Sequence, residues 1–319
     1  MAIMDDVRQL AQSGRANEAI RLVEERAAGS DAEAMFILAN WRLWGMYGPK
    51  NLDQCHQLLK RSAEGGSSEA AMLRATLINN GTGCRPDPAA ARGILEQWRA
   101  IVPGAADQLG LLDKMTPTQA SSWSEKRLSD DPPIRMIEQL FTPGECDYVL
   151  RIAEPELRPS MIIDEATGRP RPHPVRTSSS MNFGPSEEDL VIHALNLRIA
   201  AVTGTDPAAG EPLHILRYTP GQEFRPHVDA IAGAPNQRQW TAITYLNEEF
   251  AGGETDFPDV GLRVVGRKGD CLLFRNTTEA GDPHPRARHA GLPVSSGMKW
   301  VASRWIRQHP YEPEIAGGY

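Results

Sequence analysis

The sequence predicts an α+β protein in two parts, with an α-helical domain over residues 1–125 and a β-rich domain over residues 126–319. The chain has 319 residues, about twice the length of a typical domain. Of its 25 prolines, which tend to end helices, 5 lie in residues 1–120 and 20 in residues 121–319. The apolar pattern also changes, from a recurring helical spacing in the first part to short runs in the second.

Composition excludes several classes of function. The net charge of −7 gives no basic field for nucleic acid and no polybasic patch for a membrane. The first fifteen residues include acidic side chains and no apolar signal-peptide core, and no stretch approaches the ~20 apolar residues of a membrane helix. The four cysteines form no CxxC pair, which favours reduced thiols over a zinc or redox motif. We therefore expect a cytoplasmic protein that binds neither nucleic acid nor membranes.

A recurrence of 36 residues organises the first part. It relates the apolar pairs Leu22-Val23, Leu58-Leu59 and Ile94-Leu95, and likewise Gly45 and Gly81. Within one unit, Ala34, Leu38 and Trp41 lie at i, i+4 and i+7, one face of a helix, and a turn and a second helix follow. A unit this short cannot bury its own apolar face, so the units must stack on one another.

Two stretches of this part carry a resemblance. WGMYGPKNLDQCHQLLKRSAEGGSSEAAM and the later NGTGCRPDPAAARGIL resemble the Sel-type branch of tetratricopeptide-like repeats, over about residues 5–102. The resemblance implies a helical solenoid whose concave surface contacts proteins or peptides. The alternative is an appendage that serves only in packing or dimerisation.

The second part begins after the segment SDDPP, because Pro132-Pro133 cannot continue a helix. A short strand is predicted over residues 134–137. The sequence TPGE at residues 142–145 has the cap residue, proline and glutamate of a helix start. A second helix is predicted over residues 187–202.

From residue 214 onward the pattern becomes one of short apolar runs between glycines and prolines. The runs are HILRY, WTAITYLN, LRVVG, DCLLFRN and KWVASRWIR. Several short strands at close spacing predict an all-β barrel or sandwich.

Three side chains in this region suggest a metal site. His227 and Asp229 are two residues apart, so in extended chain both project to the same side, and His289 follows sixty residues after Asp229. Two imidazoles and one carboxylate leave three positions of an octahedral metal open. Non-haem iron(II) oxygenases use this facial arrangement to bind a co-substrate and O₂ together.

The segments around these residues carry a second resemblance. RYTPGQEFRPHVDA, TAITYLNEEFAGGETDFP, GDCLLF and RHAGLPVSSGMKWVASRWIR are similar, in order and spacing, to iron(II)- and 2-oxoglutarate-dependent dioxygenases of the prolyl 4-hydroxylase branch. The resemblance implies a double-stranded β-helix (jelly roll) with supporting helices. It also implies iron(II), 2-oxoglutarate and O₂, with ascorbate as reductant. Its implied site residues are His227, Asp229 and His289 for iron, and Lys299, Tyr218 and Thr244 for 2-oxoglutarate.

The resemblance also implies a reaction, the hydroxylation of a proline in a protein or peptide with release of succinate and CO₂. Substrate contacts are implied for Arg238 and Trp305, and Arg176 is a candidate at the entrance. Arg307 stands where plant- and animal-like members more often have histidine, and each arginine also fits a solvated surface position. The alternatives are a hydroxylase of a free amino acid or another side chain, and a repeat-based adaptor or sensor with an inactive dioxygenase fold. The sequence leaves the target, the hydroxylated carbon and the oligomeric state open.

Overall fold

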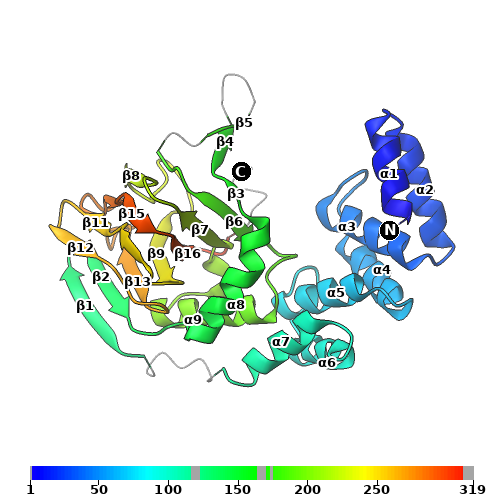
Figure 1. Cartoon of the computed structure of the whole chain (residues 1–319), viewed down its shortest axis with the longest axis horizontal. Coiled ribbons are helices and arrows are strands. Elements are labelled where there is room, and N and C mark those ends of the chain that lie inside the picture. The colour runs from blue at the N-terminus through cyan, green and yellow to red at the C-terminus, as the bar shows by residue number, and fades with distance from the viewer. Residues whose placement is uncertain (1, 116–122, 164–169, 173–174, 312–319) are drawn as a thin grey trace. The chain divides into compact units, whose positions relative to one another are not determined.

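The structure is a computed structural model that describes residues 2–115, 123–163, 170–172 and 175–311 (Figure 1). Its contacts divide the chain into two units, residues 1–115 with 185–193 and residues 116–184 with 194–319. The predicted boundary at residue 125 falls inside the second unit, at the first residue of its first strand.

The first unit is a series of helices in which each packs against the next. Its helices are α1 (Ala2–Gln12), α2 (Ala16–Ala28), α3 (Ala32–Trp44), α4 (Leu52–Glu64), α5 (Ser68–Asn80), α6 (Pro88–Trp98) and α7 (Pro103–Leu112). Sequence reasoning ended the helical pattern at about residue 102 and missed α7, which begins with a proline in its first turn.

The ends of these helices recur at the spacing seen in the sequence. Asp31 and Ser67, 36 residues apart, cap α3 and α5 by accepting a hydrogen bond from the backbone N–H three residues on. Gly45 and Gly81 end the same two helices in the left-handed conformation, with φ of 68° and 79°. The predicted helices therefore lie where the pattern placed them.

The second unit is built from antiparallel strands in two main sheets. The eight-stranded sheet has the order β1 (Glu125–Asp130), β2 (Pro133–Ile137), β13 (Cys271–Arg275), β9 (Arg238–Tyr245), β16 (Lys299–Arg307), β7 (Leu213–Tyr218), β6 (Ser179–Phe183) and β3 (Arg158–Pro159). The four-stranded sheet has the order β12 (Leu262–Val264), β11 (Thr255–Phe257), β14 (His289–Gly291) and β8 (Phe224–His227). Two smaller pairs join β10 (Phe250–Gly252) to β15 (Val294–Gly297) and β4 (Met161–Ile163) to β5 (Pro170–Pro172).

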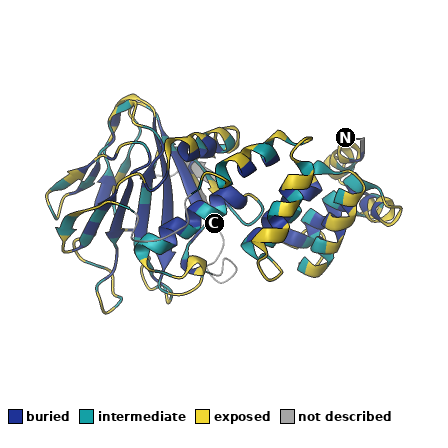
Figure 2. Cartoon of the chain, turned by 90° about the horizontal axis from the view of Figure 1, so that it is seen from below, coloured by how far each residue is buried: buried dark blue, intermediate teal, exposed yellow. Residues whose placement is uncertain are grey.

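The core of the second unit lies between the two main sheets. Tyr245, Leu272 and Phe274 from the large sheet pack in one cluster with Phe257 and Val264 from the small sheet, and Figure 2 shows the strands as largely buried. The predicted α+β class with a jelly-roll domain is confirmed, and each of the five apolar runs contains a strand. Sequence reasoning missed β1, which is polar along most of its length. None of the helices among the described residues is both long and apolar enough to cross a bilayer.

Helices α8 (Pro143–Ala153) and α9 (Leu190–Thr203) support the large sheet. The predicted start of α8 is confirmed, because Thr142 and Glu145 form a reciprocal capping box. Helix α9 begins three residues later than predicted, since the Asp189 carboxylate accepts the N–H of Ile192 and so acts as its cap.

A buried ion pair joins these two helices. The Arg198 guanidinium on α9 donates to both carboxylate oxygens of Glu145 on α8, at 2.7 and 2.8 Å. Both side chains are almost fully buried. Because the same carboxylate also accepts the N–H of Thr142, one glutamate fixes the start of α8 and its distance from α9.

Replacing Arg198 with methionine should strongly destabilise the second unit, because it leaves the Glu145 carboxylate buried without its charge partner. The expected cost is about 3–5 kcal/mol of unfolding free energy. Chemical denaturation followed by circular dichroism measures it. Asp147→Ala, which breaks an exposed ion pair with Lys268, is the control and should cost at most about 1 kcal/mol. Equal stability of the two variants would contradict the stabilising role of the Glu145–Arg198 ion pair.

Candidate active site

The three expected metal ligands meet at one antiparallel pair of strands. His227 ends β8, His289 begins β14, and the two residues face each other in the register of this pair. The Asp229 carboxylate oxygens lie 3.6 Å from Nε2 of His227 and 3.5 Å from Nε2 of His289. One ligand atom from each residue lies within 4.8 Å of the others, so the three can hold one metal ion.

Backbone carbonyls set the orientation of both imidazoles. Nδ1 of His227 lies 2.8 Å from the carbonyl oxygen of Arg225, and Nδ1 of His289 lies 3.1 Å from that of Ala287. A carbonyl can only accept, so Nδ1 donates in each ring, and Nε2, the atom nearer Asp229, is the one placed to bind a metal. Burial lowers the pKa of His289 to about 4, which keeps this ring neutral and able to bind a metal.

Two buried side chains orient the Asp229 carboxylate. Thr241 on β9 donates its hydroxyl hydrogen to Oδ2 of Asp229 at 2.6 Å, and the Asn276 amide donates to the Thr241 hydroxyl at 2.8 Å. Burial alone would raise the pKa of Asp229, but the neighbouring His289 and His227 rings hold it well below its usual range. Sequence reasoning missed Thr241 and Asn276, since a threonine in a strand and an asparagine after one carry no local signal.

The loop over residues 276–288 determines where His289 lies. It makes a turn at residues 285–286, after which Ala287 and His289 are buried and Arg288 between them is exposed. The outward side chains are tied to aspartates in two other turns: His284 and Arg286 to Asp131, each at 2.9 Å, and Arg288 to Asp259 at 2.8 and 3.1 Å. The segment before His289 is therefore held by ion pairs to a turn of each main sheet.

Lys299, at the start of β16, places a buried cation in the same cavity as the three ligands. Its Nζ donates to the carbonyl oxygen of Gly253 at 2.6 Å and lies 5.8 Å from the centre of the Tyr218 ring. No carboxylate of the described residues lies within ion-pair distance of this ammonium group. Burial lowers the pKa of Lys299 to about 8, and the more distant Glu254 carboxylate only partly opposes this effect. A buried ammonium without an anionic partner is suited to an anionic ligand.

The structure brings Tyr218 to this cavity but not Thr244. Tyr218 lies opposite Lys299 in the β16–β7 register and lines the cavity. Thr244 is fully buried but absent from the lining, whereas its neighbour Ile243 is part of it. Because side chains alternate along a strand, Thr244 faces the opposite side of the sheet. The expected contact of Thr244 with 2-oxoglutarate is therefore corrected, and Tyr218 alone of the pair remains.

Two of the expected substrate arginines are held by a buried glutamate. Glu211 accepts two hydrogen bonds from Arg238, at 2.7 and 2.8 Å, and lies 2.6 Å from Nε of Arg307. The Arg238 guanidinium also stacks over the Trp305 ring at 4.0 Å, and Trp305 lines the cavity. Arg307 is 5% exposed, so it is not the solvated surface residue that sequence reasoning allowed. Sequence reasoning missed Glu211, which precedes β7 with no motif of its own.

Arg176 lies beside Phe224, an aromatic neighbour of a metal ligand. It forms an isolated β-bridge with Phe224, and its guanidinium lies 5.6 Å from the centre of the Phe224 ring. That ring in turn stacks on His227, with centres 3.5 Å apart. Burial lowers the pKa of Arg176. Arg176 is thus placed one side chain away from a metal ligand.

A jelly roll with a buried His–Asp–His cluster is the architecture of 2-oxoglutarate-dependent oxygenases. Residues 213–307 match the 2OG-Fe(II) oxygenase superfamily. Prolyl 4-hydroxylase 1 of Arabidopsis thaliana is 35% identical over 206 residues, which cover 59% of this chain and 70% of that protein. Probable prolyl 4-hydroxylase 10 of the same plant is 32% identical over 209 residues, covering 58% and 72%. The chain belongs to the prolyl 4-hydroxylase family and is a 2-oxoglutarate-dependent dioxygenase.

Solved structures give more distant similarities. The viral collagen prolyl hydroxylase of Paramecium Bursaria Chlorella virus-1, in its 2OG complex, is 27% identical and has a TM-score of 0.45, with 55% of this chain and 95% of that chain covered. A Sel1 repeat protein from Oxalobacter formigenes is 26% identical and has a TM-score of 0.27, with 28% and 69% covered.

Replacing Thr241 with valine should weaken metal binding by about 10- to 100-fold, because the Asp229 carboxylate loses the hydroxyl that orients it. Titration of the metal-free protein with Mn²⁺ measures this affinity directly. Thr244→Val is a matched control on the opposite face of the same strand and should bind Mn²⁺ like the parent protein. Equal loss of affinity in the two variants would show that the effect is one of strand packing.

Proposed function

We propose that this dioxygenase hydroxylates a proline in a protein or peptide, with release of succinate and CO₂. In this proposal His227, Asp229 and His289 bind iron(II), and Lys299 binds the distal carboxylate of 2-oxoglutarate. The observation that carries the proposal is the presence, in one cavity, of three convergent metal ligands and a buried ammonium group without a carboxylate partner.

The donor set fits the metal and co-substrate that the family uses. Two imidazoles and one carboxylate, contributed by three residues, match the ligands of non-haem iron(II) oxygenases. When bound, iron(II) would activate O₂ as the oxidant, and 2-oxoglutarate would supply two electrons and take up one oxygen atom in becoming succinate and CO₂, so that the other oxygen atom could convert a C–H bond into an alcohol. The protein then has to bind, orient and shield the reactants.

Each of these tasks has candidate residues in the cavity. Lys299 donates hydrogen bonds to the co-substrate carboxylate, and Tyr218, whose pKa burial raises to about 12, remains a neutral hydroxyl that can donate a second. Thr241 and Asn276 keep the Asp229 carboxylate in one orientation. Leu216, Ile243 and Val301 line the remaining wall and exclude water from the reacting atoms.

Support for a proline substrate comes from the relatives and from the cavity rim. The relatives are named as prolyl 4-hydroxylases. Trp305 lines the cavity, an aromatic side chain of the kind suited to a proline ring, and Arg238 stacks on it while bound to Glu211. In this proposal Trp305 contacts the substrate, Arg238 and Arg307 hold the rim through Glu211, and Arg176 lies at the entrance.

Three further features belong to the same proposal. The helices of the first unit recruit the protein target, ascorbate maintains the metal in its reduced state, and the protein acts in the cytoplasm, where its free cysteines stay reduced. The second candidate is hydroxylation of a free amino acid or another peptidyl side chain, which the same metal site would serve. An inactive adaptor is disfavoured by the complete set of ligands.

The purified protein with iron(II), ascorbate and 2-oxoglutarate should produce succinate and add one oxygen atom to proline-containing peptides. Mass spectrometry of peptides and of treated cell extract detects the addition. His289→Ala should abolish both products, because it removes a ligand. Succinate formation stimulated only by a free amino acid would contradict the peptide assignment, and no turnover with any peptide or extract would favour the adaptor.

Affinity for 2-oxoglutarate should fall as the pH rises above about 8. Lys299 binds the carboxylate in its protonated form, and its pKa of about 8 means that this form is lost above pH 8. The affinity should then fall by up to about tenfold for each further pH unit. Lys299→Arg keeps a charged side chain at this pH and should flatten the profile. Lys299→Met should weaken binding about 30-fold or more at pH 7. Calorimetry with Mn²⁺-loaded protein measures the 2-oxoglutarate affinity of the parent and of both variants. Identical pH profiles for the parent and the arginine variant would contradict the role of Lys299.

A further inference from the structure

The backbone of His284, in the loop between β13 and β14, is hydrogen-bonded to two residues that orient metal ligands. Its carbonyl oxygen accepts the N–H of Ala287 at 3.2 Å, and the Ala287 carbonyl oxygen lies 3.1 Å from Nδ1 of His289. Its own N–H donates to the carbonyl oxygen of Asn276 at 2.8 Å. Asn276 is the residue whose amide holds the hydroxyl group that orients Asp229. His284 is therefore one step from the supports of two different ligands.

The imidazole ring of His284 is fixed through both of its nitrogen atoms. Nδ1 accepts the backbone N–H of Arg286 at 3.2 Å, so Nδ1 carries no hydrogen and Nε2 is the donor. Nε2 donates to Oδ1 of Asp131 at 2.9 Å. The other carboxylate oxygen of Asp131 accepts from Nη1 of Arg286, also at 2.9 Å. The His284 side chain is only 9% exposed, whereas that of Asp131 is 64% exposed.

Asp131 connects the loop to the large sheet at a second point. It lies in the turn between β1 and β2, 153 positions before His284. Strand β2 pairs with β13, the strand from which the loop leaves the sheet, and Ile134 near the start of β2 lies opposite Phe274 near the end of β13. The loop is therefore held by the same end of the sheet twice, through β13 where it begins and through Asp131 at its turn.

We propose that His284 is a positioning residue of the metal centre and that Asp131 holds it in place. Through Ala287 it fixes the His289 ring, and through Asn276 it fixes the segment that orients Asp229. The inference rests on the metal site of the proposed function. Residues that orient ligands from outside the coordination shell typically change metal affinity by about 10- to 100-fold. An exposed pair such as Asp131 with His284 contributes little to overall stability, so its loss should affect metal affinity more than folding.

Titration of the metal-free, full-length protein with Mn²⁺, with the free ion measured by electron paramagnetic resonance, tests the proposal. Asp131→Ala and His284→Ala should each weaken Mn²⁺ binding about tenfold. The double variant should also lose about tenfold rather than a hundredfold, because both substitutions break the same contact. His284→Gln keeps a side-chain N–H for Asp131 and should bind within about threefold of the parent protein.

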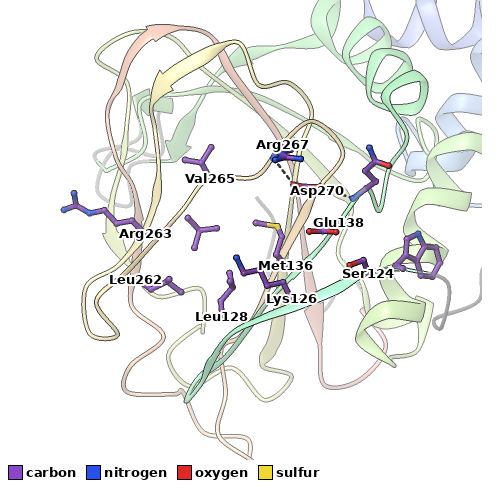
Figure 3. A pocket seen from close by; sticks show the side chains of 13 residues that line it. Ser124, Lys126, Leu128, Met136, Glu138, Leu262, Arg263, Val265, Arg267 and Asp270 are labelled. Carbon is purple, nitrogen blue, oxygen red and sulfur yellow. Dashed lines mark hydrogen bonds between the residues drawn. The ribbon is translucent and has the colours of Figure 1, made fainter.

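Two control variants have matched positions. Asp282→Ala removes the same charge as Asp131→Ala from an exposed side chain of the same loop, and it should bind Mn²⁺ like the parent. Lys126→Ala changes an exposed residue of the same hairpin, on β1, whose side chain lines a separate groove between this hairpin and β12 (Figure 3), and it should also bind like the parent. Thermal unfolding of the metal-free variants, with midpoints within about 3 °C of the parent, should show that all of them fold.

His289→Ala separates this inference from the metal site itself. If the parent binds Mn²⁺ and His289→Ala does not, the site stands. The positioning role is then overturned if Asp131→Ala and His284→Ala bind as tightly as Asp282→Ala, or if the double variant loses about a hundredfold. A parent that binds no Mn²⁺, or that binds it no more tightly than His289→Ala, overturns the metal site and this inference together.

Discussion

The register of one short strand pair is the constraint on which the active site depends. In the antiparallel β8–β14 ladder His227 and His289 face each other, with ring centres 4.3 Å apart, although sixty-two positions separate them in sequence. A shift of one residue would turn one imidazole to the other face of the sheet. The Asp229 carboxylate is buried beside them, and the hydrogen bond that it accepts from the Thr241 hydroxyl offsets part of its desolvation.

The two faces of the large sheet have different roles, because side chains alternate along each strand. On β16 the residues Lys299, Val301, Ser303 and Trp305 alternate toward the cavity, so a single strand carries the proposed co-substrate contact at one end and the proposed substrate contact at the other. The opposite face of the large sheet is used for support. Arg304 donates from that face to the Asn196 carbonyl on α9, and the Glu145–Arg198 pair fixes α9 to α8.

Local sequence patterns predicted the strands of the five apolar runs, the helix start at Thr142 and the common side of His227 and Asp229, because each depends on residues close together in the chain. Local patterns could not predict features that depend on contacts between segments far apart in the sequence. Thr241 and Asn276 meet Asp229 only through the packing of β9 and β13, and Glu211 meets Arg307 only through the folded sheet. The error at Thr244 has the same origin, since the inner face of β9 is set by its neighbours. Strand β1 was missed because its side chains are mostly polar.

The central claim is that His227, Asp229 and His289 bind one metal and that Lys299 binds the co-substrate beside it. A crystal structure of the protein with Mn²⁺ and 2-oxoglutarate, with anomalous scattering to locate the metal, tests it most directly. The account predicts one anomalous peak in contact with the two Nε2 atoms and the Asp229 carboxylate, and a co-substrate carboxylate at Nζ of Lys299. A metal bound elsewhere, or a co-substrate whose carboxylates both lie away from Lys299, would contradict it.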